Sequence, residues 1–298
     1  MTVKEHYFCI AGFWLALHLP ETWNLDALLP SFQTFRRAKE EGCKRLIDCV
    51  VEPLSSMQQI EPEGTIIEET ANDAGYIRLY ANTDGYDVTL SVYPDSIRHY
   101  MQANKEFSSI RIFLYQEEKD AGRILSSLLR VAYSQAILLH DALSIHASAI
   151  HHQGKAFLFM GKSGTGKSTH SALWMKHIPK TELLNDDNPT VRIICDRAYA
   201  WGTPWSGKTP CYKNLFYPIE GMVRLNQATE NSFRRQEGTD AFVTLLPGCS
   251  VISQDPVLRN KLYDTLSRLS EIVPVATLDC RPDKEAALLC NEALTEAH

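Results

Sequence analysis

An eight-residue glycine-rich segment constrains the fold of this chain more than any other feature of its sequence. Residues Gly161-Lys-Ser-Gly-Thr-Gly-Lys-Ser168 match the pattern G-x-x-x-x-G-K-[ST] in full. The segment stands between an apolar run, Ala156 to Met160, and a helical stretch, Ser168 to His177, which Pro179 stops. Strand, loop and helix in this order predict a P-loop. The alternative is a glycine-rich turn without a ligand, but the Lys-Ser pair and the flanking elements favour the P-loop.

The residue types of this loop predict how it binds phosphate. Glycines let backbone N–H groups converge on phosphate oxygens, and the start of the next helix adds the positive end of its dipole. Lys167 is expected to reach the β- and γ-phosphates, and the Ser168 hydroxyl is expected to ligate Mg²⁺. We therefore expect a site for a nucleoside triphosphate with Mg²⁺, formed by Gly161, Lys162, Ser163, Gly164, Thr165, Gly166, Lys167, Ser168 and Thr169.

Two adjacent aspartates, Asp186 and Asp187, follow the short apolar run Leu183 to Asn185. At the carboxyl end of a strand in a P-loop fold, one carboxylate can hold Mg²⁺, and a second can accept the proton of an attacking hydroxyl. Neighbouring strand residues point to opposite sides, so both serve one site only if the strand has already ended, as Asn188-Pro189 indicates. The alternative is a structural Asp-Asp-Asn-Pro turn. Which aspartate has which role is left open.

A histidine, His146, stands at the start of the expected strand Ile145 to Ile150, just before the P-loop strand. A lone histidine at such a position is more often structural than a ligand. The other histidines show no spacing typical of a metal site.

A loop rich in tryptophan and glycine, Trp201 to Lys208, follows the aspartates. Its composition suits a mobile wall that closes over substrate, with Trp205 and Lys208 as candidate contacts and Lys208 neutralising a phosphoryl oxygen. The alternative is an ordinary Pro/Gly turn whose tryptophans pack on the core.

The chain as a whole, 298 residues with 44% hydrophobic content, is long enough for two domains. Residues 1–120 are expected to form a β-rich N-terminal domain, with a hairpin from Tyr76–Tyr80 and Val88–Tyr93. An apolar stripe at helical spacing predicts a helix over Gly122–His140 that leads into the second domain, residues 121–298. The fold class is therefore α/β, a β-rich domain followed by a P-loop core.

Composition restricts the location and partners of the chain. It carries 30 Lys and Arg against 36 Asp and Glu, a formal charge of −6, without a long basic run, so nucleic acid or an acidic membrane is not an expected partner. No signal peptide or spanning segment is evident, which predicts a cytoplasmic protein. The eight cysteines include no Cys-x-x-Cys pair and are expected to be reduced core thiols.

Taken together, His146-Ala-Ser-Ala, the loop from Gly161 to Ser171 and Asp186-Asp187 resemble a run of ATP-dependent phosphoenolpyruvate carboxykinase. They also resemble the C-terminal kinase domain of HPr kinase/phosphorylase, over about residues 143 to 190. The resemblance implies a kinase core of the HPr-kinase/phosphoenolpyruvate-carboxykinase type that uses ATP with Mg²⁺ or Mn²⁺. It implies catalytic roles for His146, Lys167, Asp186 and Asp187, with His146 near the transferred phosphate or its metal. Ser168 and Asp186 would be the metal contacts.

The resemblance also has limits that shape the expected reaction. A carboxykinase proper needs a much longer chain, and HPr kinases carry a glycine- and arginine-containing segment where this chain has Trp201 to Lys208. We therefore expect an ATP- and Mg²⁺-dependent kinase that phosphorylates a hydroxyl acceptor, either serine in a protein or peptide or a small molecule. A non-catalytic ATP-binding regulatory module and a carboxykinase-like lyase are the alternatives. A homo-oligomer is compatible with the resemblance.

Overall fold

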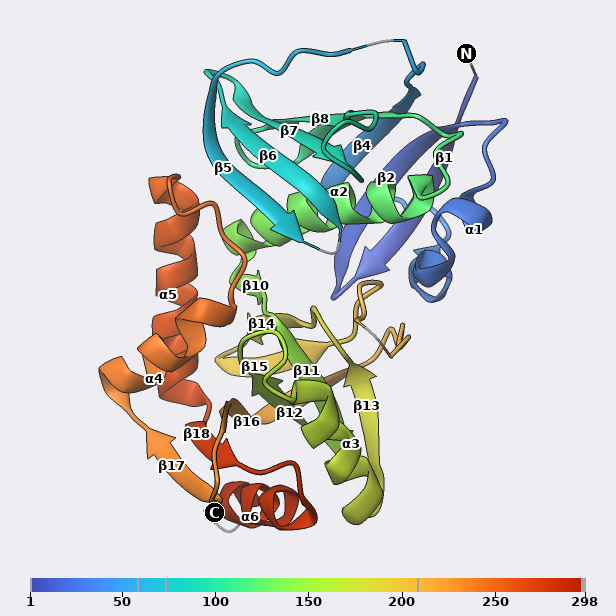
Figure 1. Ribbon diagram of the computed structural model, residues 1–298. Coiled ribbons are helices and arrows are strands. Elements are labelled where there is room, and N and C mark those ends of the chain that lie inside the picture. Colours follow the sequence, from blue (N-terminus) through green and yellow to red (C-terminus); the bar gives the residue numbers. More distant parts are fainter. Residues whose placement is uncertain (1, 58, 73, 208, 296–298) are drawn as a thin grey trace. The chain divides into compact units, whose positions relative to one another are not determined.

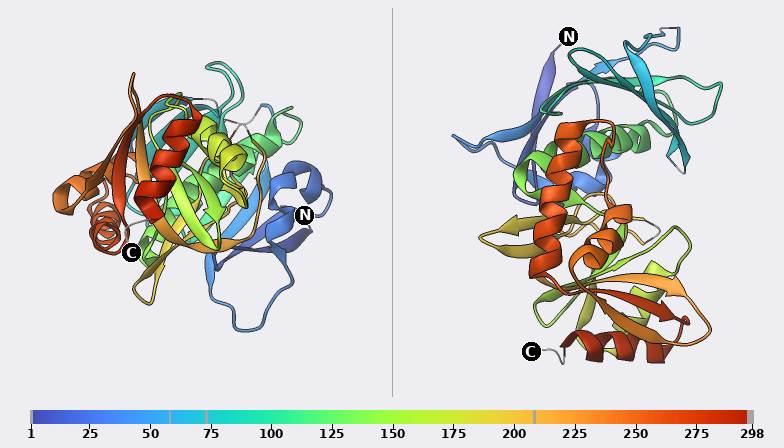
Figure 2. Two further views of the ribbon diagram at one scale, coloured as in Figure 1. Left: turned by 90° about the horizontal axis from the view of Figure 1, so that it is seen from below. Right: turned by 90° about the vertical axis from the view of Figure 1, so that its left-hand side faces the viewer.

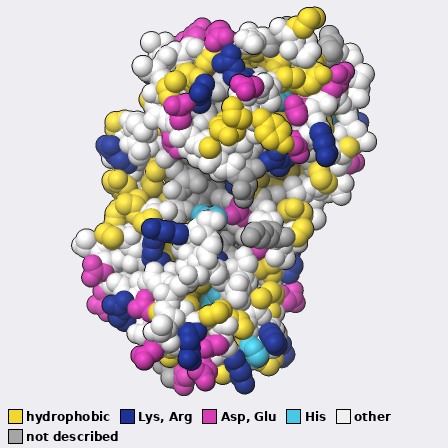
Figure 3. Space-filling view, viewed as in Figure 1, with side chains coloured by type: hydrophobic (Ala, Val, Ile, Leu, Met, Phe, Trp, Pro, Cys, Tyr) yellow, Lys and Arg dark blue, Asp and Glu magenta, His cyan; other side chains and the backbone are white. Residues whose placement is uncertain are grey.

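The computed structural model describes residues 2–57, 59–72, 74–207 and 209–295. The chain is a mixed α/β protein with two large β-sheets (Figure 1), and it divides into two compact units, Met1–Leu139 and His140–His298. No helix in the described ranges is long and apolar enough to cross a membrane. Lys and Arg side chains are interspersed with Asp and Glu over the face shown in Figure 3.

The first unit contains a nine-stranded sheet in the order β3-β1-β2-β4-β9-β8-β7-β6-β5. Its strands are β1 Val3–Ile10, β2 Phe13–Pro20, β3 Arg36–Arg37, β4 Arg45–Pro53, β5 Thr65–Asn72, β6 Gly75–Ala81, β7 Gly85–Ser91, β8 His99–Asn104 and β9 Ser109–Leu114. Its helices are α1 Leu25–Leu28, a 3₁₀ turn Pro30–Phe35, and α2 Ala121–Ala136, which a 3₁₀ turn Ile137–His140 continues.

Two hairpins show how local sequence sets the turns of this sheet. Ala11 and Gly12 both have positive φ, 51° and 79°, so the apolar stretch Tyr7–Leu19 is divided into β1 and β2. Between β6 and β7, the Asn82 side-chain oxygen accepts hydrogen bonds from the backbone N–H groups of Asp84 (2.9 Å) and Gly85 (2.8 Å). The hairpin expected from the sequence is thereby confirmed.

Helix α2 belongs to the first unit. The predicted apolar stripe is buried, with Ile124, Leu128 and Ala132 inaccessible to solvent. These residues pack the helix against β4, β7, β8 and β9. The division of the chain therefore lies after Leu139, whereas the sequence suggested that this helix opens the second domain.

The second unit contains a sheet whose main path is β10-β14-β15-β16-β12-β11-β13, with β18 paired to β16 and β17 paired to β18. Its strands are β10 Ala142–Ser144, β11 Ala147–His152, β12 Lys155–Met160, β13 Thr181–Asn185, β14 Thr190–Ile194, β15 Arg197–Trp201, β16 Phe216–Gln227, β17 Ser232–Gln236 and β18 Val275–Cys280. Its helices are α3 Lys167–His177, α4 Gly238–Leu245, a 3₁₀ turn Leu246–Gly248, α5 Pro256–Ile272 and α6 Lys284–Thr295.

Strand directions bring four chain segments to one edge of this sheet. Strand β12 is parallel to β16 and antiparallel to β11, which is in turn antiparallel to β13. Strands β12, β13 and β16 therefore run the same way and end at the same edge, after Met160, Asn185 and Gln227. Strand β11 begins at that edge with Ala147. The polar segments beside these positions are thus neighbours in space.

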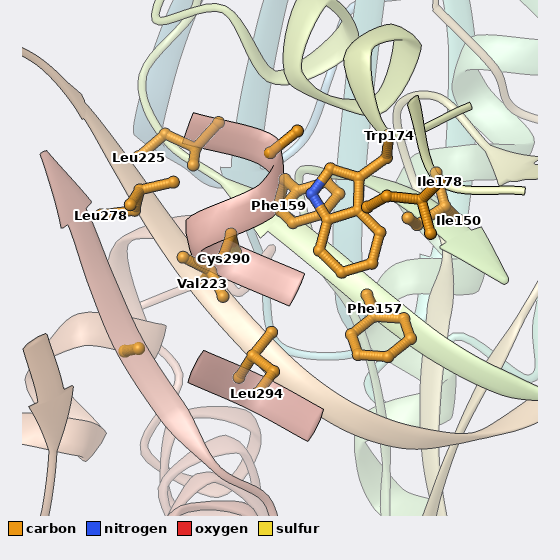
Figure 4. Close-up of a cluster of buried hydrophobic side chains, with 12 residues drawn as sticks. Ile150, Phe157, Phe159, Trp174, Ile178, Val223, Leu225, Leu278, Cys290 and Leu294 are labelled. Atoms are coloured by element: carbon orange, nitrogen blue, oxygen red, sulfur yellow. The ribbon is translucent and has the colours of Figure 1, made fainter. Parts of the chain in front are cut away.

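An apolar cluster holds α3 and α6 on one face of the sheet. The two helices lie side by side (Figures 1 and 2) and bury Trp174 of α3 with Phe157 and Phe159 of β12 and Leu294 of α6 (Figure 4). Burial of each large apolar side chain contributes about 1.5–3 kcal/mol. The cluster fixes the start of α3 relative to the end of β12, and hence the shape of the loop between them.

Candidate functional site

The glycine-rich loop joins the end of β12 to the first residue of α3, in the order expected from the sequence. Gly161, Gly164 and Gly166 have positive φ of 153°, 81° and 105°, a region that favours glycine. The carbonyl of Lys162 accepts hydrogen bonds from the backbone N–H (3.1 Å) and the hydroxyl (2.6 Å) of Thr165, which closes the turn. Lys162, Ser163, Gly164, Ser168 and Thr169 are exposed. The result is an open turn at the start of a helix, a position at which anions commonly bind.

The Lys167 side chain is buried beneath this loop. Its ammonium donates to His146 Nε2 (2.9 Å) and to the carbonyl oxygens of Gly161 (3.0 Å) and Lys162 (3.4 Å). Burial lowers the pKa of Lys167, and the nearby carboxylates of Asp187 and Asp186 oppose that shift. The structure therefore joins the loop lysine to the histidine that precedes β11.

His146 lies in the short gap between β10 and β11, where its backbone N–H donates to the carbonyl of Gly248 (2.7 Å). Its Nδ1 is 3.0 Å from Asp187 Oδ1. Because Nε2 accepts from the Lys167 ammonium, the ring proton of the neutral imidazole is on Nδ1, the nitrogen that faces Asp187. Lys167, His146 and Asp187 thus form a continuous line of polar contacts, a hydrogen bond followed by a close nitrogen–oxygen contact.

Asp186 is held by a second, separate set of groups. Its side chain is buried, with 6% of the residue exposed, and its Oδ1 accepts from the Ser148 hydroxyl (2.8 Å). The Ser148 and Ser171 hydroxyl oxygens are 2.7 Å apart, so Ser171 donates to Ser148 while Ser148 donates to the carboxylate. Asp186 Oδ2 accepts from the backbone N–H of Thr209 (3.3 Å). Strand β11 and helix α3 therefore fix this carboxylate together.

Asn185, the last residue of β13, shapes the bend that carries both aspartates. It is fully buried, and its Oδ1 accepts from the backbone N–H groups of Asp187 (3.0 Å) and Asn188 (2.9 Å). Its Nδ2 donates to the Trp205 carbonyl (3.0 Å) and the Thr203 hydroxyl (3.2 Å). The strand thus ends ahead of both aspartates, as expected. The sequence did not lead us to predict a role for Asn185, although an amide at the end of an apolar strand is a feature that indicates a role in ending the strand.

The tryptophan-containing segment departs from the expected mobile wall. Trp205 is 5% exposed, and the Trp201 ring stacks on Phe216 with centroids 4.0 Å apart, so both indoles are packed against the unit. A side chain at Gly207 would come within 2.9 Å of the Asp186 carbonyl, so the backbone runs close to the aspartates. Lys208, the other predicted contact in this loop, lies outside the described residues.

The donor groups of the site suit a magnesium ion bound together with phosphate. Within residues 2–57, 59–72, 74–207 and 209–295, no group of three or more His, Cys, Asp or Glu side chains could hold a metal by itself. A Mg²⁺ ion that binds phosphate oxygens and water needs only one or two protein carboxylates. The Asp186 carboxylate and the exposed Ser168 hydroxyl offer oxygen ligands of this kind.

Comparisons with known proteins leave the family of the chain open. No family of proteins matches its sequence, and no curated protein matches it. Among solved structures, the Hpr(Ser) kinase/phosphatase from Coxiella burnetii is similar at 14% sequence identity and a TM-score of 0.32. That match covers 52% of this chain and 89% of the other chain. A likeness this low carries no argument about function.

Proposed function

We propose that this protein is an ATP- and Mg²⁺-dependent phosphotransferase that transfers a γ-phosphoryl group to a hydroxyl acceptor. The observation that carries the proposal is the line of close polar contacts from the Lys167 ammonium through His146 to the Asp187 carboxylate. It joins a cation inside the glycine-rich loop after β12 to a carboxylate after β13, the second strand along the sheet. Phosphoryl transfer needs these two groups close together.

The loop and Lys167 bind the phosphates in this proposal. Exposed backbone N–H groups at the start of α3 donate hydrogen bonds to phosphate oxygens. The Lys167 ammonium gives up its hydrogen bonds to the loop carbonyls and binds the γ-phosphate instead. Because the Lys167 ammonium is already buried, it loses little hydration when phosphate binds. Its positive charge therefore stabilises the negative charge that develops on the phosphoryl group. When bound, Mg²⁺ on Asp186 and Ser168 would neutralise the phosphate charge further.

Asp187 is the proposed proton acceptor. Its side chain is 21% exposed, whereas Asp186 is buried under Ser148 and the Thr209 N–H group. The acceptor oxygen bonds to the γ-phosphorus while the bond from that phosphorus to the bridging oxygen breaks, and ADP takes the electron pair. The hydroxyl proton passes to Asp187, and His146 orients that carboxylate through its Nδ1–H.

The decisive experiment is an ADP-release assay with Mg²⁺ against a panel of acceptors. The panel contains free serine, serine-containing peptides and hydroxylated small metabolites, with Lys167→Ala as the blank. We expect acceptor-dependent ADP release, together with a phosphorylated acceptor that is visible by mass spectrometry. Tight ATP binding without turnover on any acceptor would instead favour a regulatory module, and release of CO₂ from oxaloacetate would favour a lyase.

A further inference from the structure

A cavity of about 410 Å³ opens beside the glycine-rich loop. One wall is the loop from Lys162 to Thr165, and the other is the carboxyl end of β16 from Arg224 to Gln227. None of the roles proposed for Lys167, His146 or the two aspartates uses this cavity.

The order of strands places this cavity on the opposite side of the loop from the aspartates. Along the sheet, β12 has β16 on one side and β11, followed by β13, on the other. His146 precedes β11, and Asp186 and Asp187 follow β13, so the γ-phosphate end of a bound triphosphate lies toward that side. A triphosphate that crosses the loop from there continues toward β16, where the cavity lies.

The β16 wall carries groups that suit a ribose and a base. Asn226 and Gln227 have carboxamides, which both donate and accept as base edges do, and the Arg224 guanidinium can stack on a base plane. Arg224 is half-buried and donates to the Thr244 carbonyl of α4 (3.3 Å). Gln227 Nε2 donates to the Gly164 carbonyl (3.2 Å), so this wall is tied to the loop. Both walls are therefore held in place relative to each other.

We propose that this cavity is the nucleoside subsite, in which the ribose and base of the nucleotide lie against Arg224 and Asn226. The inference rests on the proposed function, because it assumes that the loop binds a triphosphate. It adds the direction of the nucleotide, with the γ-phosphate toward β13 and the nucleoside toward β16. It also implies that residues at the end of β16 make a nucleotide bind more tightly than inorganic polyphosphate does.

The test compares binding of ATP with binding of inorganic tripolyphosphate, both with Mg²⁺, by calorimetry on the full chain. The variants are Arg224→Met and Asn226→Ala, which remove polar groups from the β16 wall. The matched control is Asn231→Ala. Asn231 donates to Asp283 (3.0 Å) much as Asn226 donates to Asp279 (2.9 Å), but it lies outside the cavity walls.

We expect each cavity variant to weaken ATP binding about tenfold and to leave tripolyphosphate binding within about twofold, while Asn231→Ala changes neither. Unchanged ATP affinity in both cavity variants would overturn the subsite. Equal weakening of both ligands would also overturn it, because the damage would then be to the loop. A wild-type chain that binds tripolyphosphate as tightly as ATP has no nucleoside subsite. A wild-type chain that binds neither ligand would overturn the proposed function as well.

Discussion

Both units of this protein contain a histidine within 3.0 Å of an aspartate oxygen and beside a cation, but the three groups are connected differently. In the first unit, His18 Nε2 is 2.7 Å from Asp48 Oδ1. In the second, His146 Nδ1 is 3.0 Å from Asp187 Oδ1. The residue types are nearly the same, so the difference lies in where the cation binds.

In the first unit the cation binds the carboxylate directly. Arg45 donates to Asp48 and also to the Tyr7 hydroxyl (3.2 Å), and all of these side chains lie along sheet strands. The arginine and aspartate neutralise each other within a partly exposed network, where such pairs contribute about 0–1 kcal/mol. In this arrangement the Asp48 carboxylate is shared between Arg45 and His18.

In the second unit the imidazole separates the cation from the carboxylate. Lys167 contacts His146 and two loop carbonyls, so its charge is available to an anion that enters the loop. The histidine, the lysine and the aspartate lie beside strand ends rather than along strands, which is where a glycine-rich loop can admit a ligand. The comparison supports the proposal that the second cluster, by its position on the sheet and its connections, is the binding site.

The largest effect is expected for loss of the loop cation. Lys167→Ala should lower acceptor-dependent ADP release about 10³-fold, because the charge that faces the phosphoryl group is removed. Arg45→Ala, its counterpart in the first unit, should leave turnover unchanged. Steady-state kinetics on both variants measure the contrast. Equal losses in the two variants would contradict the distinction between the units.

A smaller loss is expected when the carboxylate partner of each histidine is neutralised. Asp187→Asn keeps the shape of the side chain but removes the proton acceptor, so turnover should fall about 10²-fold while ATP affinity is retained. Asp48→Asn should change neither turnover nor affinity and should cost at most about 1 kcal/mol of unfolding free energy. Single-turnover rates and urea denaturation separate these results. Full activity of Asp187→Asn would remove Asp187 from the mechanism.

The buried serine that holds Asp186 should have a still smaller effect on catalysis. Ser148→Ala removes the hydroxyl that donates to Asp186, so the Mg²⁺ concentration for half-maximal activity should rise about tenfold. Ser144→Ala is the matched control, because Ser144 is equally buried but its hydroxyl has no hydrogen-bond partner among the described residues. A Mg²⁺ titration of activity compares the two. An equal shift in both variants would indicate a general packing effect.

The smallest contrast concerns acid stability, to which the buried histidines His99 of the first unit and His170 of the second contribute. Burial lowers the pKa of His170 and that of His99 to about 4. The unfolded chain therefore binds more protons between pH 6.5 and 4, and stability falls as pH drops through this range. For each histidine the unfolding free energy should fall about 1 kcal/mol per pH unit below 6.5.

His170→Gln and His99→Gln should each reduce the fall of the unfolding free energy with decreasing pH by the amount that the replaced histidine contributes. Denaturant unfolding at pH 7.5, 6.5 and 5.5 measures the slope for the wild type and both variants. An unchanged slope in both variants would show that other groups set the acid sensitivity.

The parts of the fold that sequence predicted best are those with a local cause. The glycine-rich loop between a strand and a helix, the hairpin of β6 and β7, and the apolar stripe of α2 are all decided by neighbouring residues, and each is found where expected. The placement of α2 was wrong because the sequence does not reveal which sheet an apolar stripe packs against. Only contacts between residues far apart in the sequence decide whether α2 packs on the sheet of the first unit or on that of the second.

For the candidate site, residue types could be predicted but connections could not. The loop and the two aspartates are predicted from motif and order, and His146 from the family resemblance, yet their convergence depends on the antiparallel placement of β11 between β12 and β13. The hydroxyl pair Ser148 and Ser171 has no local signature, because it forms between a strand and a helix. Composition leaves Trp205 open between a mobile wall and a turn packed on the core, because composition does not distinguish an exposed indole from a buried one.

The most direct test of the account is a calorimetric titration of Mg²⁺-ATP into the wild-type chain, Lys167→Ala and Arg45→Ala. The account predicts binding of one nucleotide per chain in the wild type and in Arg45→Ala, and loss of that binding in Lys167→Ala. Nucleotide binding that survives in Lys167→Ala at wild-type affinity, or that is absent from the wild type, would contradict it.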